Sequence, residues 1–261
     1  MTPTTSKEQI RAYYDALYHA WGSQHWWPAR TRFEVIVGAY LTQNTSWKNV
    51  EIALRRLRTE GLLNLAGIRA IRLEKLETMI RPAGYFRQKA ERLKRFVAFV
   101  DQRYAGSLSR LLSQPTQKLR QELLSLNGVG PETADSILLY AGQHPVFVVD
   151  AYTRRILERH GIAPAKAKYE ELRELFERSL SGIVPAKLRT ENRELETGFR
   201  PIPHSPSPMS HTRRSPQAQV YNEMHGLIVA VGKYYCRKSE PRCEQCPLRV
   251  FLPQGSPNGT T

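Results

Sequence analysis

A glycine-rich turn and a single acid are the features of this chain whose residue types and spacing best suit chemistry. Gly128, Val129 and Gly130 form the turn, and Asp150 lies twenty residues after Gly130, at the end of the apolar run 146–149. A glycine-rich turn before a helix exposes backbone N–H groups where a phosphate can bind. A carboxylate near such an anchor could act on the anchored strand, so the pair predicts chemistry on a phosphate-bearing polymer.

Each feature also has a simpler structural interpretation. Glycine at the end of a helix is commonly only a cap. Asp150 comes directly before an expected helix at 151–160, so its side chain could do no more than cap that helix. The two roles of Asp150 are compatible, because a capping carboxylate is also held in a fixed orientation. The combination of turn, acid and basic charge favours the chemical role.

The charge of the chain indicates the partner. Its 39 Lys and Arg residues exceed its 24 Asp and Glu residues, which gives a formal net charge of +15 and a pI of about 10.0. A charge of this size points to nucleic acid as the partner. The basic residues are dispersed, as at Arg87, Lys89, Arg154 and Arg155, which suits a broad surface that follows phosphates. For any single cluster, a solvated basic surface is the alternative.

Hydrophobic periodicity predicts an all-α fold. No alternating strand pattern is long enough to compete, and the apolar run 146–149 is expected to be a buried extended connection. Residues 196–217 hold five prolines and four serines without periodicity and are expected to form a flexible loop. The expected helices cover residues 6–21, 30–43, 47–59, 69–80, 87–103, 108–113, 117–125, 131–142, 151–160, 167–180 and 219–234.

Three cysteines, Cys236, Cys243 and Cys246, lie close together near the end of the sequence. An odd number of clustered cysteines is not a disulfide framework, and it indicates a reducing compartment and a candidate metal site. Residues 1–22 lack the apolar core of a secretory signal, and no apolar run approaches the ~18 residues of a membrane span. These features predict a cytoplasmic protein that does not enter a membrane.

The segment 126–155 resembles the helix-hairpin-helix of the endonuclease III superfamily of DNA glycosylases, together with its Gly/Pro-rich loop and aspartate. Segments 32–44 (RFEVIVGAYLTQN), 83–89 (AGYFRQK) and 225–246 resemble further family segments in the expected order, so the resemblance covers most of residues 25–250. It implies two helical domains flanking a DNA-binding cleft, with a helix-hairpin-helix and a C-terminal cysteine loop.

The resemblance implies a role for each segment. Asp150 would stabilise the oxocarbenium ion that forms on the sugar and help to activate water, since a carboxylate in a low-dielectric site stabilises such a charge strongly. The hairpin would hold a DNA phosphate with backbone amides and bind an alkali cation. The implied DNA-binding residues are Gln43, which would fill the gap left by a flipped base, and Gly128, Val129, Gly130, Arg87 and Lys89.

Glu132 is the most informative departure from the family pattern. Members that also cut the strand carry a lysine at this position, and its amine forms a Schiff base with the sugar. A carboxylate cannot form an imine, so this position closes the lyase route. The chain is expected to be a monofunctional glycosylase with water as the nucleophile. A lysine from elsewhere, and with it an endonuclease III-like glycosylase and AP lyase acting on oxidised pyrimidines, is the alternative.

An aromatic cluster indicates the substrate. Trp26, Trp27 and Pro28, with Trp47 after Gln43, resemble the base pocket of the bacterial 3-methyladenine DNA glycosylases of this superfamily. An N-alkylated purine is cationic, and indole faces attract it by cation–π interactions of ~0.5–2 kcal/mol each. Such a base is also a good leaving group, so one aspartate and a stacking pocket would suffice. Packing of these aromatics in a core is the simpler interpretation.

The cysteine loop leaves three outcomes open. Cys236, Cys243 and Cys246 reproduce three of the four ligands of the family's [4Fe–4S] loop, and Leu252 stands where the fourth is expected. A cluster with incomplete cysteine ligation is one outcome, and a loop held by packing without metal is the second. A zinc site with His225 or a loop histidine as fourth ligand is the third. A cluster here would act structurally, by stiffening a basic loop that touches DNA.

Together these features predict a base excision repair enzyme that removes a damaged base, an alkylated purine such as 3-methyladenine, from double-stranded DNA. Residues 30–135 would form a helical barrel domain ending in the hairpin, and residues 1–29 with 136–261 a second helical domain with the cysteine loop. We expect a monomer that is bacterial, cytoplasmic and associated with the nucleoid. A non-catalytic helix-hairpin-helix module that only binds DNA is the rival from another functional class.

Overall fold

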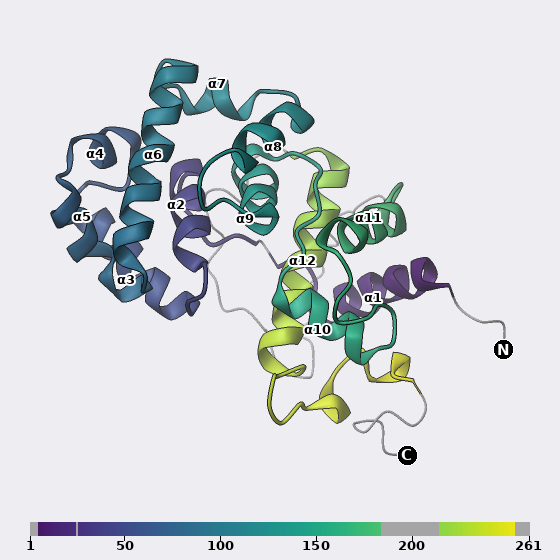
Figure 1. The fold of residues 1–261 in the computed structure, drawn as a ribbon. Helices are drawn as coiled ribbons and strands as arrows, with labels where there is room; N and C mark the ends of the chain where they lie inside the picture. The colour runs from purple at the N-terminus through teal and green to yellow at the C-terminus, as the bar shows by residue number, and fades with distance from the viewer. Residues whose placement is uncertain (1–4, 25, 184–213, 254–261) are drawn as a thin grey trace. The chain divides into compact units, whose positions relative to one another are not determined.

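The computed structural model describes residues 5–24, 26–183 and 214–253, and within them the expected all-α fold is confirmed, with no β-strand. The helices appear in Figure 1. Their bounds are α1 Ser6–Trp21, α2 Arg32–Thr42, α3 Trp47–Thr59, α4 Leu65–Ala70, α5 Leu73–Ile80, η1 Arg81–Ala83, α6 Phe86–Tyr104, α7 Leu108–Leu112, α8 Thr116–Leu124, α9 Pro131–Ser136, η2 Ile137–Gly142, α10 Ala151–Arg159, α11 Tyr169–Leu180, α12 Pro216–Tyr234, η4 Cys243–Gln245 and η5 Arg249–Phe251.

The chain divides into two compact units. One is formed by residues 29–144, and the other by residues 1–28 together with 145–261. The expected boundary at 135/136 therefore falls at 144/145. The reason is that η2, a π-helical turn, continues directly from α9 and packs against α2 of the same unit. Residues 145–149 then lead into the second unit as a connection.

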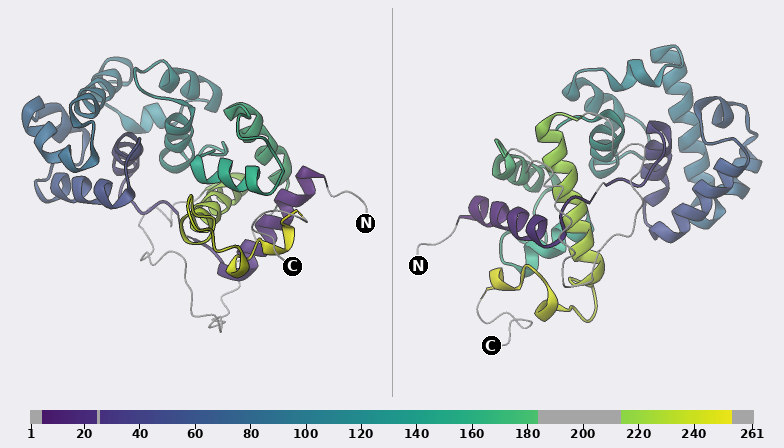
Figure 2. Two further views of the ribbon diagram at one scale, coloured as in Figure 1. Left: turned by 60° about the horizontal axis from the view of Figure 1, so that its bottom comes forward. Right: turned by 180° about the vertical axis from the view of Figure 1, so that it is seen from behind.

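α2 is the central helix of the unit formed by residues 29–144. All its residues from Phe33 to Leu41 are buried, as expected for a helix that is apolar on every side except at Glu34, which pairs with Arg58. Thr31 caps the helix by accepting a hydrogen bond from the Glu34 amide at 3.1 Å. α3, α6, α9 and η2 pack against α2, and Figure 2 gives two further views of this packing. The packing positions Gln43, which follows the last turn of α2.

α12 has the same central role in the other unit. α1, α10 and α11 all pack against it, as Figure 1 shows. The expected extended connection 146–149 is confirmed: all four residues are buried and none is helical. α11 holds this connection, because Glu177 accepts from the Phe147 amide at 3.0 Å and Phe176 stacks on the Phe147 ring with centroids 4.2 Å apart. These contacts fix the backbone and ring of Phe147, three residues before Asp150 at the start of α10.

Two expected elements differ from the structure. The single helix expected at 69–80 is split into α4 and α5, because Ile71 is extended and its carbonyl accepts from the Lys94 ammonium. The proline-rich segment 196–217 lies outside the described residues up to position 213, while Pro216 already begins α12. Proline suits a first helical position because its missing N–H has no partner there in any case. Among the described residues, no helix has both the length and the apolar character for crossing a membrane.

Candidate functional site

Asp150 caps α10, as the simpler interpretation predicted. Its Oδ1 accepts from the Thr153 amide at 2.7 Å and from the Thr153 hydroxyl at 2.9 Å. The Asp150 amide faces the same hydroxyl at 3.4 Å, which completes a capping box. The other carboxylate oxygen, Oδ2, takes no part in the cap. Asp150 is therefore held rigidly with one oxygen committed to the helix.

His225 of α12 faces the second oxygen of Asp150. Its Nε2 lies 3.7 Å from Asp150 Oδ2, and the two side chains are 4% and 13% exposed. Phe147 packs edge-on against the imidazole with ring centroids 6.2 Å apart. Burial lowers the pKa of His225, although the charge of Asp150 acts in the opposite direction. The imidazole beside the carboxylate is therefore neutral at neutral pH.

α12 also holds the first two residues of the expected base pocket. Trp26 and Trp27 are both buried, and their rings lie 5.8 Å apart in an edge arrangement. Glu223 of α12 accepts from the Gln24 amide at 2.6 Å. A side-chain carbon at Gly226 would come within 3.0 Å of Trp26 Cβ, so this glycine lets the segment pack closely on the helix. The indole pair and Asp150 thus share α12 as their support.

The other two members of the expected base pocket are placed differently. Pro28 is half-buried at the end of the same segment. Trp47 is the first residue of α3 and belongs to the unit formed by residues 29–144, where its indole N–H donates to Glu51 at 2.9 Å. A pocket that joins Trp47 to the indole pair stays a prediction.

The hairpin consists of α8, the turn 125–130 and α9. Arg120 of α8 forms a bidentate ion pair with the fully buried Asp135 of α9, with N–O distances of 2.7 and 3.0 Å. Gly128 has a φ of +79°, and Gly130 is the exposed N-cap of α9. The N–H groups of a first helical turn lack partners within their helix. The hairpin is thus a rigid element with the backbone groups that a phosphate needs.

Gln43 is bonded to the hairpin. Its Nε2 donates to the Gly128 carbonyl at 3.0 Å and to the Thr133 hydroxyl at 2.9 Å. Its Oε1 accepts from Arg92 Nη1 at 2.9 Å. We call Gln43, Arg92, Gly128 and Thr133 the hairpin network. These bonds fix the Gln43 amide, so filling the gap left by a flipped base would require them to break.

Lys89 corrects one expectation. Its side chain is 1% exposed, and its ammonium donates to the carbonyls of Leu41, Ala83 and Gln43 at 2.8 to 2.9 Å. Burial lowers the pKa of Lys89 to about 8. The ammonium ties the end of α2 to the residues before α6, so the expected contact of Lys89 with a DNA phosphate is wrong. Arg87, two residues earlier, is exposed.

Glu132 occupies the second position of α9 and is exposed. An acid in the first turn interacts favourably with the helix dipole. The position where the family's lyases have a lysine is therefore held by a side chain that suits its place in the helix and cannot form an imine.

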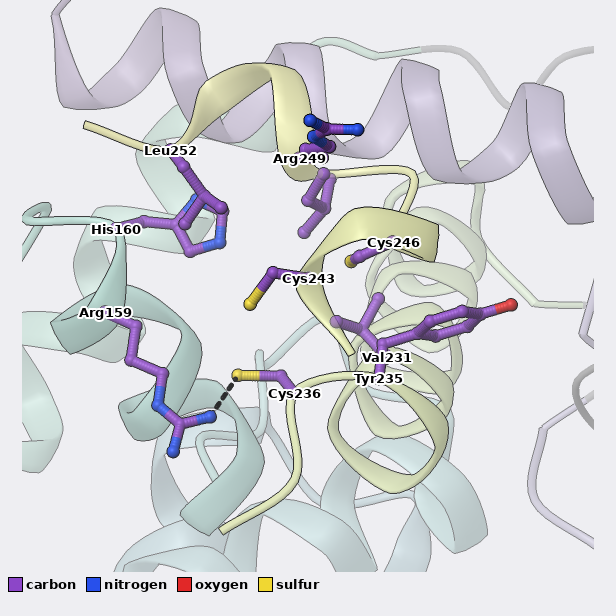
Figure 3. A pocket seen from close by; sticks show the side chains of 10 residues that line it. Arg159, His160, Val231, Tyr235, Cys236, Cys243, Cys246, Arg249 and Leu252 are labelled. Atoms are coloured by element: carbon purple, nitrogen blue, oxygen red, sulfur yellow. Dashed lines mark hydrogen bonds between the residues drawn. The ribbon is translucent and has the colours of Figure 1, made fainter. Parts of the chain in front are cut away.

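The cysteine loop is held by two arginines of α10. Arg155 donates to the carbonyls of Cys236 and Gly232 at 2.7 and 2.9 Å. Arg159 donates to the carbonyl of Arg237 at 2.6 Å and to Cys236 Sγ at 3.4 Å. Figure 3 shows the three cysteine side chains and Arg159 around a common cavity. These hydrogen bonds hold the loop against α10.

The residues around this cavity do not fit an iron–sulfur cluster. The cavity measures about 20 Å³, space for one or two water molecules. Leu252, at the expected fourth position, lines the cavity with carbon atoms only. Among the described residues no three His, Cys, Asp or Glu side chains are grouped to hold a metal ion. His225 lies beside Asp150 and is not among the residues that line this cavity, which contradicts the alternative of a zinc site with His225 as a ligand. The loop histidines fall outside the described residues.

Sequence reasoning missed two residues of this site, Arg92 and His225 as the neighbour of Asp150. Arg92 has no sequence signal beyond its basic charge, and His225 was named only as a candidate metal ligand. No local signal distinguishes either one, because each acts on a residue far away in the sequence. Every residue of α12 from Val220 to Ile228 is buried, so no spacing along this helix marks His225 as facing Asp150.

Comparisons with known proteins identify a family and relatives that share this fold. The family model described as "HhH-GPD superfamily base excision DNA repair protein" matches residues 37–181. The "Putative DNA repair glycosylase MJ1434" of Methanocaldococcus jannaschii is 42% identical over 245 residues, 94% of this chain and 96% of that protein.

Two solved structures are similar as well. The crystal structure of H. pylori 3-methyladenine DNA glycosylase (MagIII) bound to 1,N6-ethenoadenine has a TM-score of 0.66 and 29% identity, covering 88% of this chain and 97% of that one. A trapped endonuclease III–DNA covalent intermediate has a TM-score of 0.69 and 23% identity, covering 97% and 96%, and shares the fold.

Proposed function

Because this chain belongs to the HhH-GPD superfamily of base excision DNA repair proteins and is a DNA glycosylase, we propose that it removes alkylated purines from duplex DNA by hydrolysis, without cutting the strand. The observation that carries this mechanism is Glu132, an exposed carboxylate at the position of the lyase lysine. Lys89 offers no replacement, since its ammonium is buried and bonded to three carbonyls. The base is then released by water.

The proposed reaction depends on the second oxygen of Asp150. When the N-glycosidic bond breaks, positive charge develops on the sugar, and a fixed carboxylate stabilises that charge without reorganising. Asp150 is fixed in this way because Oδ1 is bonded to Thr153. Oδ2 is left to face the sugar and to orient the attacking water. Flipping the base out of the stack costs a few kcal/mol, which contacts to the flipped base must offset.

The proposed substrate rests on the indole pair. Trp26 and Trp27 form a buried aromatic pair in the same unit as Asp150. A cationic N-alkylated purine gains ~0.5–2 kcal/mol from each indole face it meets, and it leaves readily without an acid to protonate it. The similarity to the H. pylori 3-methyladenine glycosylase supports the same choice.

The hairpin is proposed to hold the phosphate backbone through the amides of Gly128 and Gly130, with Arg87 as an exposed basic residue of the same unit. The Val129 amide donates to the Leu126 carbonyl at 3.0 Å and would have to break that bond to join them. We also propose that the hairpin binds an alkali cation together with the phosphate. If it does, the affinity for duplex DNA should differ between potassium and lithium buffers of equal ionic strength. No step of the proposed reaction involves the cysteine loop.

A panel of lesion duplexes tests the proposal. Dimethyl sulfate-treated duplex DNA, a 1,N6-ethenoadenine duplex and a thymine glycol duplex are incubated with the protein, and alkali then cleaves any abasic site. We expect methylated purines to be released and strand breaks to appear only after alkali. Release of thymine glycol without release of methylated purines would contradict the proposal that alkylated purines are the substrate.

Borohydride trapping separates the two mechanisms. A monofunctional enzyme yields no covalent adduct with any of these duplexes, whereas an adduct would favour the endonuclease III-like glycosylase and AP lyase.

Asp150→Asn tests the role of the carboxylate without removing the helix cap, because asparagine also caps helices well. It should lose at least about 100-fold in release rate while its stability stays within about 1 kcal/mol of the wild type. Unchanged release by Asp150→Asn would assign the activity to another residue.

A further inference from the structure

One oxygen of Asp150 remains for the reaction once α10 is capped, and one buried side chain faces it. Asp150 Oδ2 lies 3.7 Å from Nε2 of His225, while Oδ1 is bonded twice to Thr153. We infer that His225 is a positioning residue, which orients Oδ2 of Asp150 toward the reacting sugar. This inference rests on the proposed glycosylase reaction at Asp150.

The imidazole of His225 is itself held in place. It is buried in α12, and Phe147 contacts it edge-on at an interplanar angle of 79°. Phe147 is fixed in turn by stacking on Phe176 and by the bond from its amide to Glu177. The connection 146–149 therefore touches the imidazole at Phe147 and delivers Asp150 to its Nε2. A buried ring held by Phe147 can define the direction of a carboxylate.

The charge of the imidazole suits this role. Burial lowers the pKa of His225, so the ring is neutral at neutral pH. A neutral ring with its proton on Nε2 can donate to Oδ2 and leave the carboxylate anionic, whereas an imidazolium would cancel the charge that the oxocarbenium ion needs. The separation of 3.7 Å is longer than a hydrogen bond. Contacts of catalytic groups are often long in the free enzyme and shorten when substrate binds.

The same turn of α12 supports the indole pair. Glu223 accepts from the amide of Gln24 and from the Ser23 hydroxyl at 2.6 and 2.5 Å, and Gly226 lies against Trp26. Glu223 and Gly226 therefore position the segment that carries the aromatics, while His225 between them faces the oxygen of Asp150. His225 is the member of this turn that contacts the carboxylate.

The test compares His225→Leu with His225→Gln, which keeps an N–H donor. Single-turnover release of methylated purines is measured on dimethyl sulfate-treated duplex DNA, and affinity on a duplex with a tetrahydrofuran abasic analogue. We expect His225→Leu to lose about 100-fold in release rate, the size of effect that misplacing a reacting group by about 1 Å produces. Its affinity and melting temperature should stay at wild-type values. His225→Gln should recover most of the rate.

The matched control is Met224→Leu, a buried neighbour on the same helix, which should keep the wild-type rate. The inference is overturned if His225→Leu releases base at the wild-type rate, if His225→Gln is equally slow, or if the loss only follows a loss of stability.

A second measurement does not depend on activity. Nitrogen NMR of the His225 ring should show the proton on Nε2, with a resonance that moves in Asp150→Asn. If the wild type releases no base, the proposed function fails, and the NMR result alone decides the inference. A proton on Nδ1, or a resonance unaffected by Asp150→Asn, would contradict it.

Discussion

The guanidinium of Arg92 fills the space into which a side chain at Gly128 would project. Arg92 also donates to Gln43, whose amide donates back to the Gly128 carbonyl. One guanidinium and one amide thus lock the hairpin turn to the end of α2 and to α6. Position 128 requires glycine for two reasons. Its φ of +79° is unfavourable for other residues, and the close approach of Arg92 leaves no room for a side chain.

Replacing Gly128 with alanine should therefore lower the free energy of unfolding by roughly 1–3 kcal/mol, because the new methyl group is strained and displaces Arg92. Urea denaturation measures the change. Gly130→Ala is the matched control: its φ is −89°, and a Cβ there meets no atom within 4 Å. Its stability should stay within about 0.5 kcal/mol of the wild type. Equal effects of the two substitutions would rule out the packing of Arg92 as the cause.

Replacing Arg92 with alanine should weaken binding to a tetrahydrofuran duplex by about 5- to 10-fold, because about 1 kcal/mol of hairpin anchoring is lost with the bond to Gln43. Fluorescence anisotropy at fixed salt measures the affinity. Arg95→Ala removes the same charge from α6, but Arg95 is exposed and forms an ion pair with Glu91 of the same helix. Its affinity should fall less. If both variants lose affinity equally, the loss of positive charge explains the effect, and the bonds of the hairpin network do not contribute.

Lys89 should matter for stability rather than for DNA. Lys89→Met leaves the carbonyls of Leu41, Ala83 and Gln43 without their buried donor, which should cost about 3 kcal/mol of unfolding free energy. The pKa of Lys89 is lowered to about 8 in the folded protein from 10.5. Between these values the unfolded chain binds more protons, so the Lys89 contribution to stability rises with pH through this window.

The difference in unfolding free energy between the wild type and Lys89→Met should accordingly increase from pH 8 to pH 10.5, by at most about 3 kcal/mol. Below pH 8 both states hold the proton, and the difference should be flat. Urea denaturation at a series of pH values gives the curve. A difference that falls as pH rises would contradict the buried position of the ammonium.

The cysteine loop should keep its fold without metal. Arg159→Ala removes the donors to Arg237, Lys238 and Cys236 and should lower the unfolding free energy by about 2 kcal/mol. A strong chelator should leave the melting temperature of the wild type unchanged. A brown protein that bleaches and loses stability on chelation would show that the loop rearranges around a cluster.

Much of this architecture could be predicted because its signals are local. Apolar periodicity placed the helices, the glycines at 128 and 130 marked the hairpin, and the position of Asp150 before a helix predicted its cap. The split at Ile71 was missed because a distant ammonium, that of Lys94, takes its carbonyl. Lys89 was misplaced for a similar reason, since a lysine in a basic run carries no mark of burial.

The fold class, the hairpin, the acid and the carboxylate at Glu132 could be predicted from the amino-acid sequence, because each depends on residue type and on neighbours along the chain. The burial of Lys89, the packing of Arg92 on Gly128 and the position of His225 beside Asp150 became visible only in the three-dimensional fold. Burial and the direction of a charged side chain depend on elements that fold against it from far away in the sequence. Local propensity carries no information about those elements.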